Sequence, residues 1–180
     1  MDHVDGILAE WRVERPDLDP SPMAVFGRIS RIAGRSAPLL VQLLEKYDLT
    51  PASFDVLANL RRGGAPYRKT PTELAATSML SSGGITFRLD RLESDGLIRR
   101  VRSSKDRRVA YAELTPVGLK RIDKVMDAHL RQENALLALL GPRERTELAK
   151  LLAKLERSIV EFRTADAPSN RAGKQNRSAG

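Results

Sequence analysis

The chain has 180 residues, 41% of them hydrophobic and none of them cysteine, which suits one domain with extensions and excludes disulfides, thiolate metal sites and cysteine nucleophiles. Its net charge of +8 favours nucleic acid or an anionic membrane surface as a partner. We expect no membrane span, no signal peptide and a cytoplasmic location, because no apolar run is long enough and residues 2–19 carry six acids against two arginines.

Five dipeptides predict helix starts. A small or hydroxyl residue caps the free N–H groups of a first turn, and a following proline already has a helical φ. In Thr70-Pro71 the cap is reinforced by Glu73, which completes a capping box. The other four pairs are Ser21-Pro22, Thr50-Pro51, Thr115-Pro116 and Gly141-Pro142.

The apolar spacing between these starts predicts helices with one apolar face. Pro38 lies inside the second of them, so we expect a kink or break near Ser36. Gly96 is expected to end the fifth. The expected helices span residues 4–14, 22–47, 51–61, 71–78, 82–95, 116–140 and 142–163.

Residues 101–114 read as two short strands around a charged tip. Val101, Val109, Tyr111 and Leu114 suit the strands, and the tip carries several cations and one acid. Residues 164–180 lack large apolar groups, so they are expected to form a disordered basic tail. The fold class is therefore mainly α with a small β-hairpin wing, a winged helix-turn-helix flanked by long helices.

The stretch TPTELAATSMLSSGGITFRLDRLESDGLIRR, residues 70–100, has the pattern of a helix-turn-helix. A short helix and a small-residue turn precede a second helix with leucines on one face and Arg88 and Arg91 on another. Ser81 and Ser82 at its start would let backbone amides approach phosphate. An ordinary amphipathic helix with solvated arginines would also fit, but the charged wing that follows favours a recognition helix.

The motifs D-R-L-E-x-x-G-L-I-x-R from Asp90, D-R-R from Asp106 and L-T-x-x-G from Leu114 resemble the MarR (multiple antibiotic resistance regulator) family of bacterial winged-helix transcription factors. The resemblance covers roughly residues 24–162. It implies a homodimer, in which the N-terminal and last two helices pack across a two-fold axis. It also implies two recognition helices in successive major grooves of a pseudo-palindromic operator.

We therefore expect the chain to be divided into four parts. They are an extra helix and linker at 1–20, a DNA-binding part at 50–114, dimerisation helices at 21–49 and 115–163, and the tail at 164–180. Two long amphipathic helices beside a small winged domain independently favour a dimer. A closed monomeric bundle is the alternative. The residues expected to contact DNA are Ser81, Ser82, Thr86, Arg88, Arg91, Arg102, Lys105, Arg107 and Arg108.

Base contacts are expected from Ser82, Thr86 and Arg88, and one wing arginine, Arg107 or Arg108, is expected in the minor groove. Asp106 is expected to orient one of these arginines by a charge-assisted hydrogen bond.

Trp11 on an extra first helix and Asp55 in FDVL are similar to the urate-responsive branch of that family. The resemblance implies a ligand site made of Trp11, Asp55, Arg88 and Arg100. Indole N–H and guanidinium groups suit a planar anion, which would repel Asp55 and break a pair that holds the recognition helix. Another planar carboxylate or phenol is the alternative ligand, and structural roles for Trp11 and Asp55 stay open.

An enzyme is not expected, because the two histidines are isolated and no catalytic motif occurs. We expect neither a metal nor a cofactor, only a small anionic effector. A winged helix that binds protein rather than DNA is the competing class, and the basic recognition helix disfavours it.

Overall fold

The computed structural model describes residues 2–78, 84–102, 106 and 109–165. Contacts divide the chain into two compact units, Met1–Arg131 and Gln132–Gly180. The helices are α1 (His3–Glu14), α2 (Ser21–Glu45), α3 (Pro51–Arg62), α4 (Pro71–Thr77), α5 (Ile85–Ser94), α6 (Pro116–Leu136) and α7 (Pro142–Ala165). The strands are β1 (Arg68–Lys69), β2 (Ile98–Arg102) and β3 (Ala110–Leu114).

The expected class, mainly helical with a small hairpin, is confirmed. The hairpin pairs β2 with β3 in antiparallel register, with Val101 opposite Tyr111. Sequence reasoning missed β1, which pairs with the other edge of β3 and makes the sheet order β1-β3-β2. A two-residue strand has no alternation of apolar residues by which it could have been found.

Three of the expected caps are confirmed by hydrogen bonds. The hydroxyls of Thr50, Thr70 and Thr115 accept from backbone N–H groups of α3, α4 and α6. The Glu73 carboxylate in turn accepts a hydrogen bond from the Thr70 N–H, which completes the capping box. The expected cap at Ser21 is wrong, because α2 already includes Ser21, whose N–H donates to the Asp19 carboxylate.

Of the kink or break expected near Ser36, the break is wrong, because α2 continues without interruption through Pro38, and the kink stays a prediction. A proline removes only one helical hydrogen bond, and α2 continues for more than four turns before it and about two turns after it. Two other boundaries differ from the expectation by more than two residues. Helix α6 ends at Leu136 rather than at residue 140, and the described part of α5 begins at Ile85.

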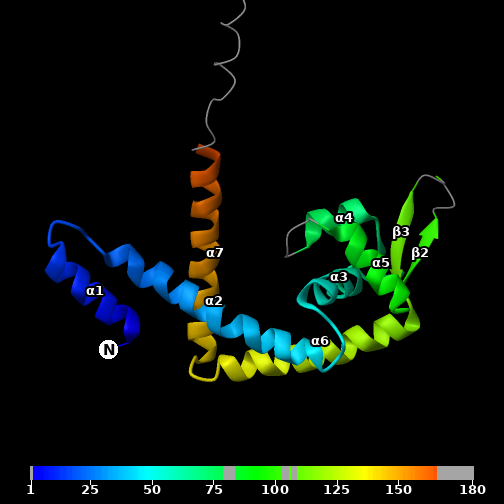
Figure 1. The fold of residues 1–180 in the computed structure, drawn as a ribbon, viewed down its shortest axis with the longest axis horizontal. Coiled ribbons are helices and arrows are strands. Elements are labelled where there is room, and N and C mark those ends of the chain that lie inside the picture. The colour runs from blue at the N-terminus through cyan, green and yellow to red at the C-terminus, as the bar shows by residue number, and fades with distance from the viewer. Residues whose placement is uncertain (1, 79–83, 103–105, 107–108, 166–180) are drawn as a thin grey trace, which may run out of the picture. The chain divides into compact units, whose positions relative to one another are not determined.

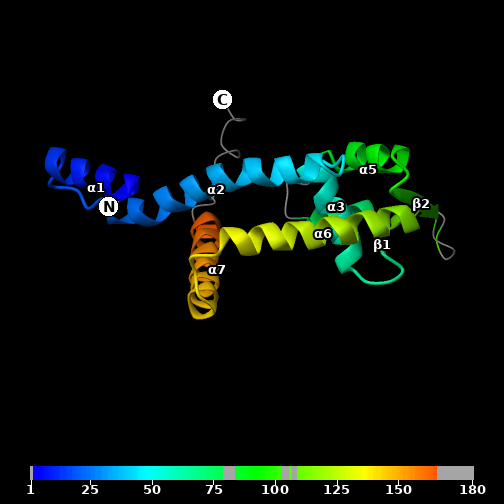
Figure 2. The same ribbon diagram turned by 90° about the horizontal axis from the view of Figure 1, so that it is seen from below.

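Within the described residues, an apolar cluster joins α3, α4, α5 and the sheet to α2 and α6. Figures 1 and 2 show the end of α2 and the first part of α6 beside α3. Leu57 and Leu60 of α3 are completely buried at its centre. Leu89 and Leu92 bring one face of α5 into the same cluster. By contrast, α1 packs against the first half of α2, away from this cluster (Figure 1).

The last residue of the L-T-x-x-G motif, Gly118, lies where a side chain has no room. A Cβ atom at this position would lie 1.9 Å from the Leu97 carbonyl oxygen, which is far inside van der Waals contact. The same carbonyl accepts from the Thr115 N–H at 3.1 Å, so it is held in place. Only glycine lets α6 begin this close to the segment that follows α5.

Replacing Gly118 by alanine is therefore expected to destabilise the fold by about 2 kcal/mol or more, because backbone has to move to admit one methyl group. Urea denaturation followed by circular dichroism measures this. Gly6→Ala is the matched control, since its Cβ would meet nothing within 4 Å. Equal stability of the two variants would contradict the close approach.

Candidate nucleic-acid interface and ligand site

Helix α5 has one buried face and one face open to solvent. Leu89 and Leu92 are buried, whereas Thr86, Asp90 and Arg91 are exposed. Arg88 is half-buried on the flank between these faces. The expected division of this helix into a core face and an outer face is thus present, with Arg91 nearer the outer face than Arg88.

The start of α5 has the geometry of a glycine cap. Gly84 has φ +75°, a conformation that other residues rarely adopt, and it has no side chain to bond the first turn. The N–H groups of that turn therefore receive no side-chain cap from this residue. Ser81 and Ser82, expected to approach phosphate here, lie outside the described residues.

Arg100 joins the wing to α5 through two carboxylates. From strand β2 its guanidinium forms ion pairs with Asp90 and, at 3.3 Å, with Glu93. The Arg100 backbone N–H also donates to the Glu93 carboxylate at 3.1 Å. Both acids belong to the D-R-L-E motif, so this motif fixes the helix to the strand that follows it.

The opposite face of the sheet carries a second charged arrangement. Glu113 is almost fully buried on the central strand and pairs with Arg99 on one side and Arg68 on the other. Arg68 also lies over the Tyr111 ring, 4.9 Å from its centroid. Cross-strand pairs of opposite charge stabilise a sheet, so part of the charge of these two arginines serves the wing itself.

The wing contributes one exposed cation among the described candidates. Arg102 is exposed on β2, opposite Ala110 of β3. Asp106, which is among the described residues, is also exposed. The other candidates at the tip, Lys105, Arg107 and Arg108, lie outside the described residues, so their contacts stay predictions.

Sequence reasoning missed a polar contact that positions α4. Asn59 of α3 is completely buried, and its amide oxygen accepts from the Lys69 ammonium at 2.7 Å. Its amide nitrogen donates to the Thr77 hydroxyl at 3.0 Å, and Arg62 donates to the Thr77 carbonyl. The end of α4 is thereby tied to α3 and β1. An asparagine among the apolar residues of α3 was the available signal.

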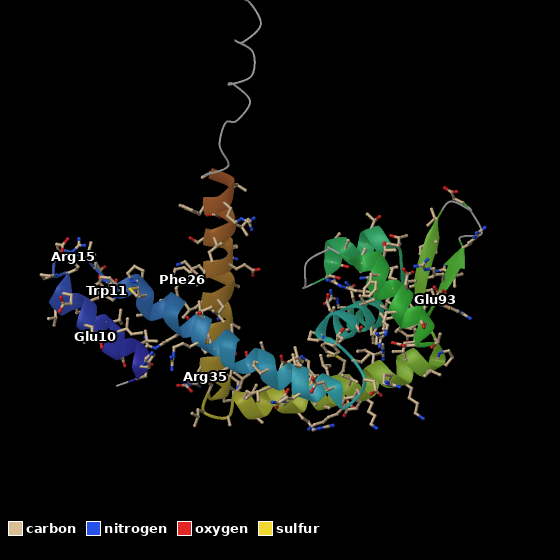
Figure 3. The ribbon with its side chains drawn as sticks, in the orientation of Figure 1. Glu10, Trp11, Arg15, Phe26, Arg35 and Glu93 are labelled. Atoms are coloured by element: carbon tan, nitrogen blue, oxygen red, sulfur yellow. The ribbon has the colours of Figure 1, made fainter. Side chains whose placement is uncertain are left out.

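The four expected ligand residues do not come together within one chain. Trp11 is 43% exposed on α1, whereas Asp55 is only 7% exposed on α3. Figure 3 shows Trp11 beside the first half of α2 and Glu93, the partner of Arg100, at the opposite end of that helix. Asp55 is therefore not a solvated helix acid, and Trp11 lies far from Arg100.

Helix α1 is attached to α2 by charge and by burial. The Arg28 guanidinium pairs with Asp2 at 2.9 Å and Asp5 at 2.7 Å, and Val4 and Leu8 are buried beneath the helix. Backbone N–H donors at the start of α1 and the Arg28 guanidinium hold the pKa of both carboxyl groups below its usual value. The position of Trp11 is thus defined by this contact.

Two hollows lie near charged side chains. One, of about 150 Å³, lies between the wing and α5 and is lined by Thr86, Leu89, Arg100 and Tyr111 among others. The other, of about 690 Å³, is a basic groove where α2 ends and α6 begins, and none of the expected ligand residues lines it. Of the four expected ligand residues, Arg100 lines the smaller hollow, and the other three line neither of these two.

In the described part of the chain, no helix is long and apolar enough to cross a membrane. The same residues contain no group of three or more His, Asp or Glu side chains suited to a metal ion.

Comparison with known proteins identifies relatives of this architecture. A family model described as MarR family matches residues 47–109. The HTH-type transcriptional regulator PecS of Dickeya dadantii (strain 3937) is 39% identical over 160 residues, covering 89% of this chain and 96% of PecS. The HTH-type transcriptional repressor MdtR of Bacillus subtilis (strain 168) is 30% identical, covering 77% of this chain and 83% of MdtR.

Among solved structures, AbsC, a MarR family transcriptional regulator from Streptomyces coelicolor, superposes with a TM-score of 0.71 at 26% identity. The superposition covers 80% of this chain and 97% of AbsC. These relatives are transcriptional regulators, which confirms the expectation that the chain is not an enzyme.

Removing the Arg100 guanidinium is expected to loosen α5 while leaving α3 unchanged, because Arg100 supplies the ion pairs that join α5 to β2. In Arg100→Ala, amide hydrogen exchange should accelerate across residues 85–94 and stay constant across 51–62. Arg102→Ala, on the same strand, is the matched control. Unchanged exchange in α5 would show that the pairs do not hold the helix.

Proposed function

Because the chain belongs to the MarR family of transcriptional regulators, we propose that it binds a pseudo-palindromic operator as a homodimer and represses transcription until a small anionic ligand releases it. The observation that carries this proposal is the pairing of α5 with the wing. Arg91 and Arg102 are exposed on two elements that Arg100 joins, so both can meet one DNA duplex. In this proposal residues 50–114 form the DNA-binding part.

The dimer is supported by apolar side chains that one chain leaves uncovered on the helices outside this part. Met23, Val25, Phe26 and Ile32 are exposed on α2, and further large apolar side chains are exposed on α7. Burying such faces is a common reason for symmetric pairing. A two-fold axis through residues 21–49 and 115–163 would set two copies of α5 about 34 Å apart, in successive major grooves.

Within each half-site we assign phosphate contacts to Ser81, Arg91 and Arg102 and base contacts to Ser82 and Arg88. Thr86 stays a candidate for base reading, although it also lines the hollow beside Arg100. The wing tip, with Lys105 and either Arg107 or Arg108, is assigned to the minor groove, and Asp106 to orienting an arginine there.

The ligand proposal is urate or another planar anion that competes for Arg100. An anion bound to this guanidinium takes the place of Asp90 and Glu93, and α5 then loses its charged contacts with β2. Buried Asp55 and half-buried Arg88 lie on the two helices, α3 and α5, whose spacing the ligand changes. The hollow beside Arg100 equally supports a small aromatic carboxylate or phenol, the alternative ligand.

Trp11 can join this site only from a second copy of the chain, because α1 packs at the far end of α2 from its own Arg100 (Figure 3). The dimer thus provides a complete site where one chain does not. In this arrangement the indole N–H of one chain and the guanidinium of the other donate to the same planar anion.

DNA contact predicts a specific dependence on salt. Arg102→Ala should weaken binding to the chain's own upstream DNA and lower the slope of log affinity against log salt by about 2, one phosphate for each subunit. The double change Arg107→Ala and Arg108→Ala should weaken binding further while the dimer persists. Fluorescence anisotropy at several salt concentrations measures both.

Lys124→Ala is the control, since it removes one charge from the basic groove on α6. An equal loss in all three variants would indicate a general charge effect. Equal affinity of the wild type for DNA and for another polyanion would favour the protein-binding alternative.

A ligand site shared between two copies predicts complementation. Trp11→Phe and Arg100→Ala homodimers should each bind urate weakly. Urate should not release Trp11→Phe from DNA as it releases the wild type, whereas Arg100→Ala should already bind DNA more weakly without urate. A mixed dimer of the two variants, purified with two affinity tags, contains one site with both native residues. Calorimetry should therefore find about half of the wild-type binding capacity in the mixed dimer.

No binding in the mixed dimer, with binding in the wild type, would contradict a site shared between two copies. No binding of urate to the wild type would exclude urate as the ligand and leave the operator proposal intact.

A further inference from the structure

Phe87 is an exposed aromatic residue on the outer face of α5. It is 75% exposed, whereas the neighbouring leucines of the same helix are buried. Leu89 and Leu92 follow it by two and five residues, so Phe87 points away from both by about 140° or more around the helix. Its ring therefore lies near the centre of the face opposite the core.

The core of the winged part is complete without this ring. Within the described residues, the apolar cluster includes Leu89 and Leu92 and takes Ile85 as a partly buried neighbour, but Phe87 is not part of it. The side chains that share its outer face are polar, namely Asp90, Arg91 and Ser94. A partner that covers this ring would remove its apolar surface from water, which is favourable.

The neighbouring charges indicate what this partner is. Arg91, four residues after Phe87, has a side chain that is 70% exposed and forms an ion pair with Asp95 on its own helix. Asp90 and Glu93 of the same helix are engaged by Arg100 rather than presented as free acids. The outer face thus combines an apolar ring with a cation, which suits the floor of a DNA major groove and its phosphate walls.

We propose that Phe87 is a specificity-determining residue that contacts thymine methyl groups in the major groove of the operator. The C5-methyl of thymine is the apolar feature that a base pair presents in that groove, and an aromatic side chain is suited to cover it. This inference rests on the proposed DNA binding by α5 and extends it, since the base contacts proposed above are all polar. Each half-site is expected to contain at least one thymine opposite the centre of α5.

The test replaces thymine by uracil, which removes only the C5-methyl and keeps base pairing. A preferred site is first obtained with the full-length protein from a pool of random duplexes. Each thymine is then replaced symmetrically in both half-sites, and affinity is measured by fluorescence anisotropy at fixed salt. For the wild type, uracil at the contacted position is expected to weaken binding by about fourfold for each methyl group lost.

Phe87→Ala should bind the thymine site more weakly than the wild type and should no longer distinguish thymine from uracil. Phe87→Leu, which keeps an apolar side chain, should retain part of the distinction. Val117→Ala is the matched control, because Val117 is also an exposed apolar residue, at 60%, but belongs to α6. It should keep the full dependence on the methyl group.

Equal thymine-to-uracil losses in the wild type and in Phe87→Ala would overturn the inference, as would the absence of any loss in the wild type. In either case the selected site would still support DNA binding. Loss of the dimer in Phe87→Ala would place the ring at a subunit contact and would also overturn the inference. Failure to select any site would instead overturn the proposed function on which it rests.

Discussion

The winged part depends on the packing of one face of α5 in the apolar cluster, to which Arg100 adds a charged attachment of α5 to β2. One guanidinium binds two carboxylates of the helix, and the backbone of the same residue binds one of them again. The helix buries only one narrow leucine face, so its rotation and tilt depend on this charged contact as well as on packing. In the proposed mechanism, an anion that competes for Arg100 would change the orientation of the DNA-facing surface.

The other arginines of the wing differ in what they can offer a partner. Arg99 and Arg68 neutralise the nearly buried Glu113, since a carboxylate at that depth needs cationic partners. Arg102 is exposed beyond them. A count of positive charges therefore overstates the DNA-binding surface, because part of the charge stabilises the sheet. The exposed face of α5 is correspondingly mixed, with Phe87 between polar side chains.

A single chain leaves two requirements unmet, and a second copy meets both in the proposed dimer. The long helices expose apolar side chains such as Phe26, and Trp11 lies far from the arginine it is proposed to assist. Arg28 holds α1 in place through two carboxylates, which keeps the tryptophan at a defined position on the first half of α2. The same pairing that buries the apolar faces would then complete the ligand site.

The order of the helices, three of their caps and the hairpin could be predicted from the sequence, because caps and apolar periodicity are local signals. The helix-turn-helix pattern and the charge of the wing were also visible there. The tertiary structure was needed to show which arginines are paired internally, that Asp55 is buried, that Phe87 faces outward and that Gly118 lies against the Leu97 carbonyl. These features depend on contacts between residues distant along the chain, and a local pattern does not contain them. The break expected near Ser36 does not occur for a related reason. The one hydrogen bond lost at Pro38 is outweighed by the other hydrogen bonds of this long helix.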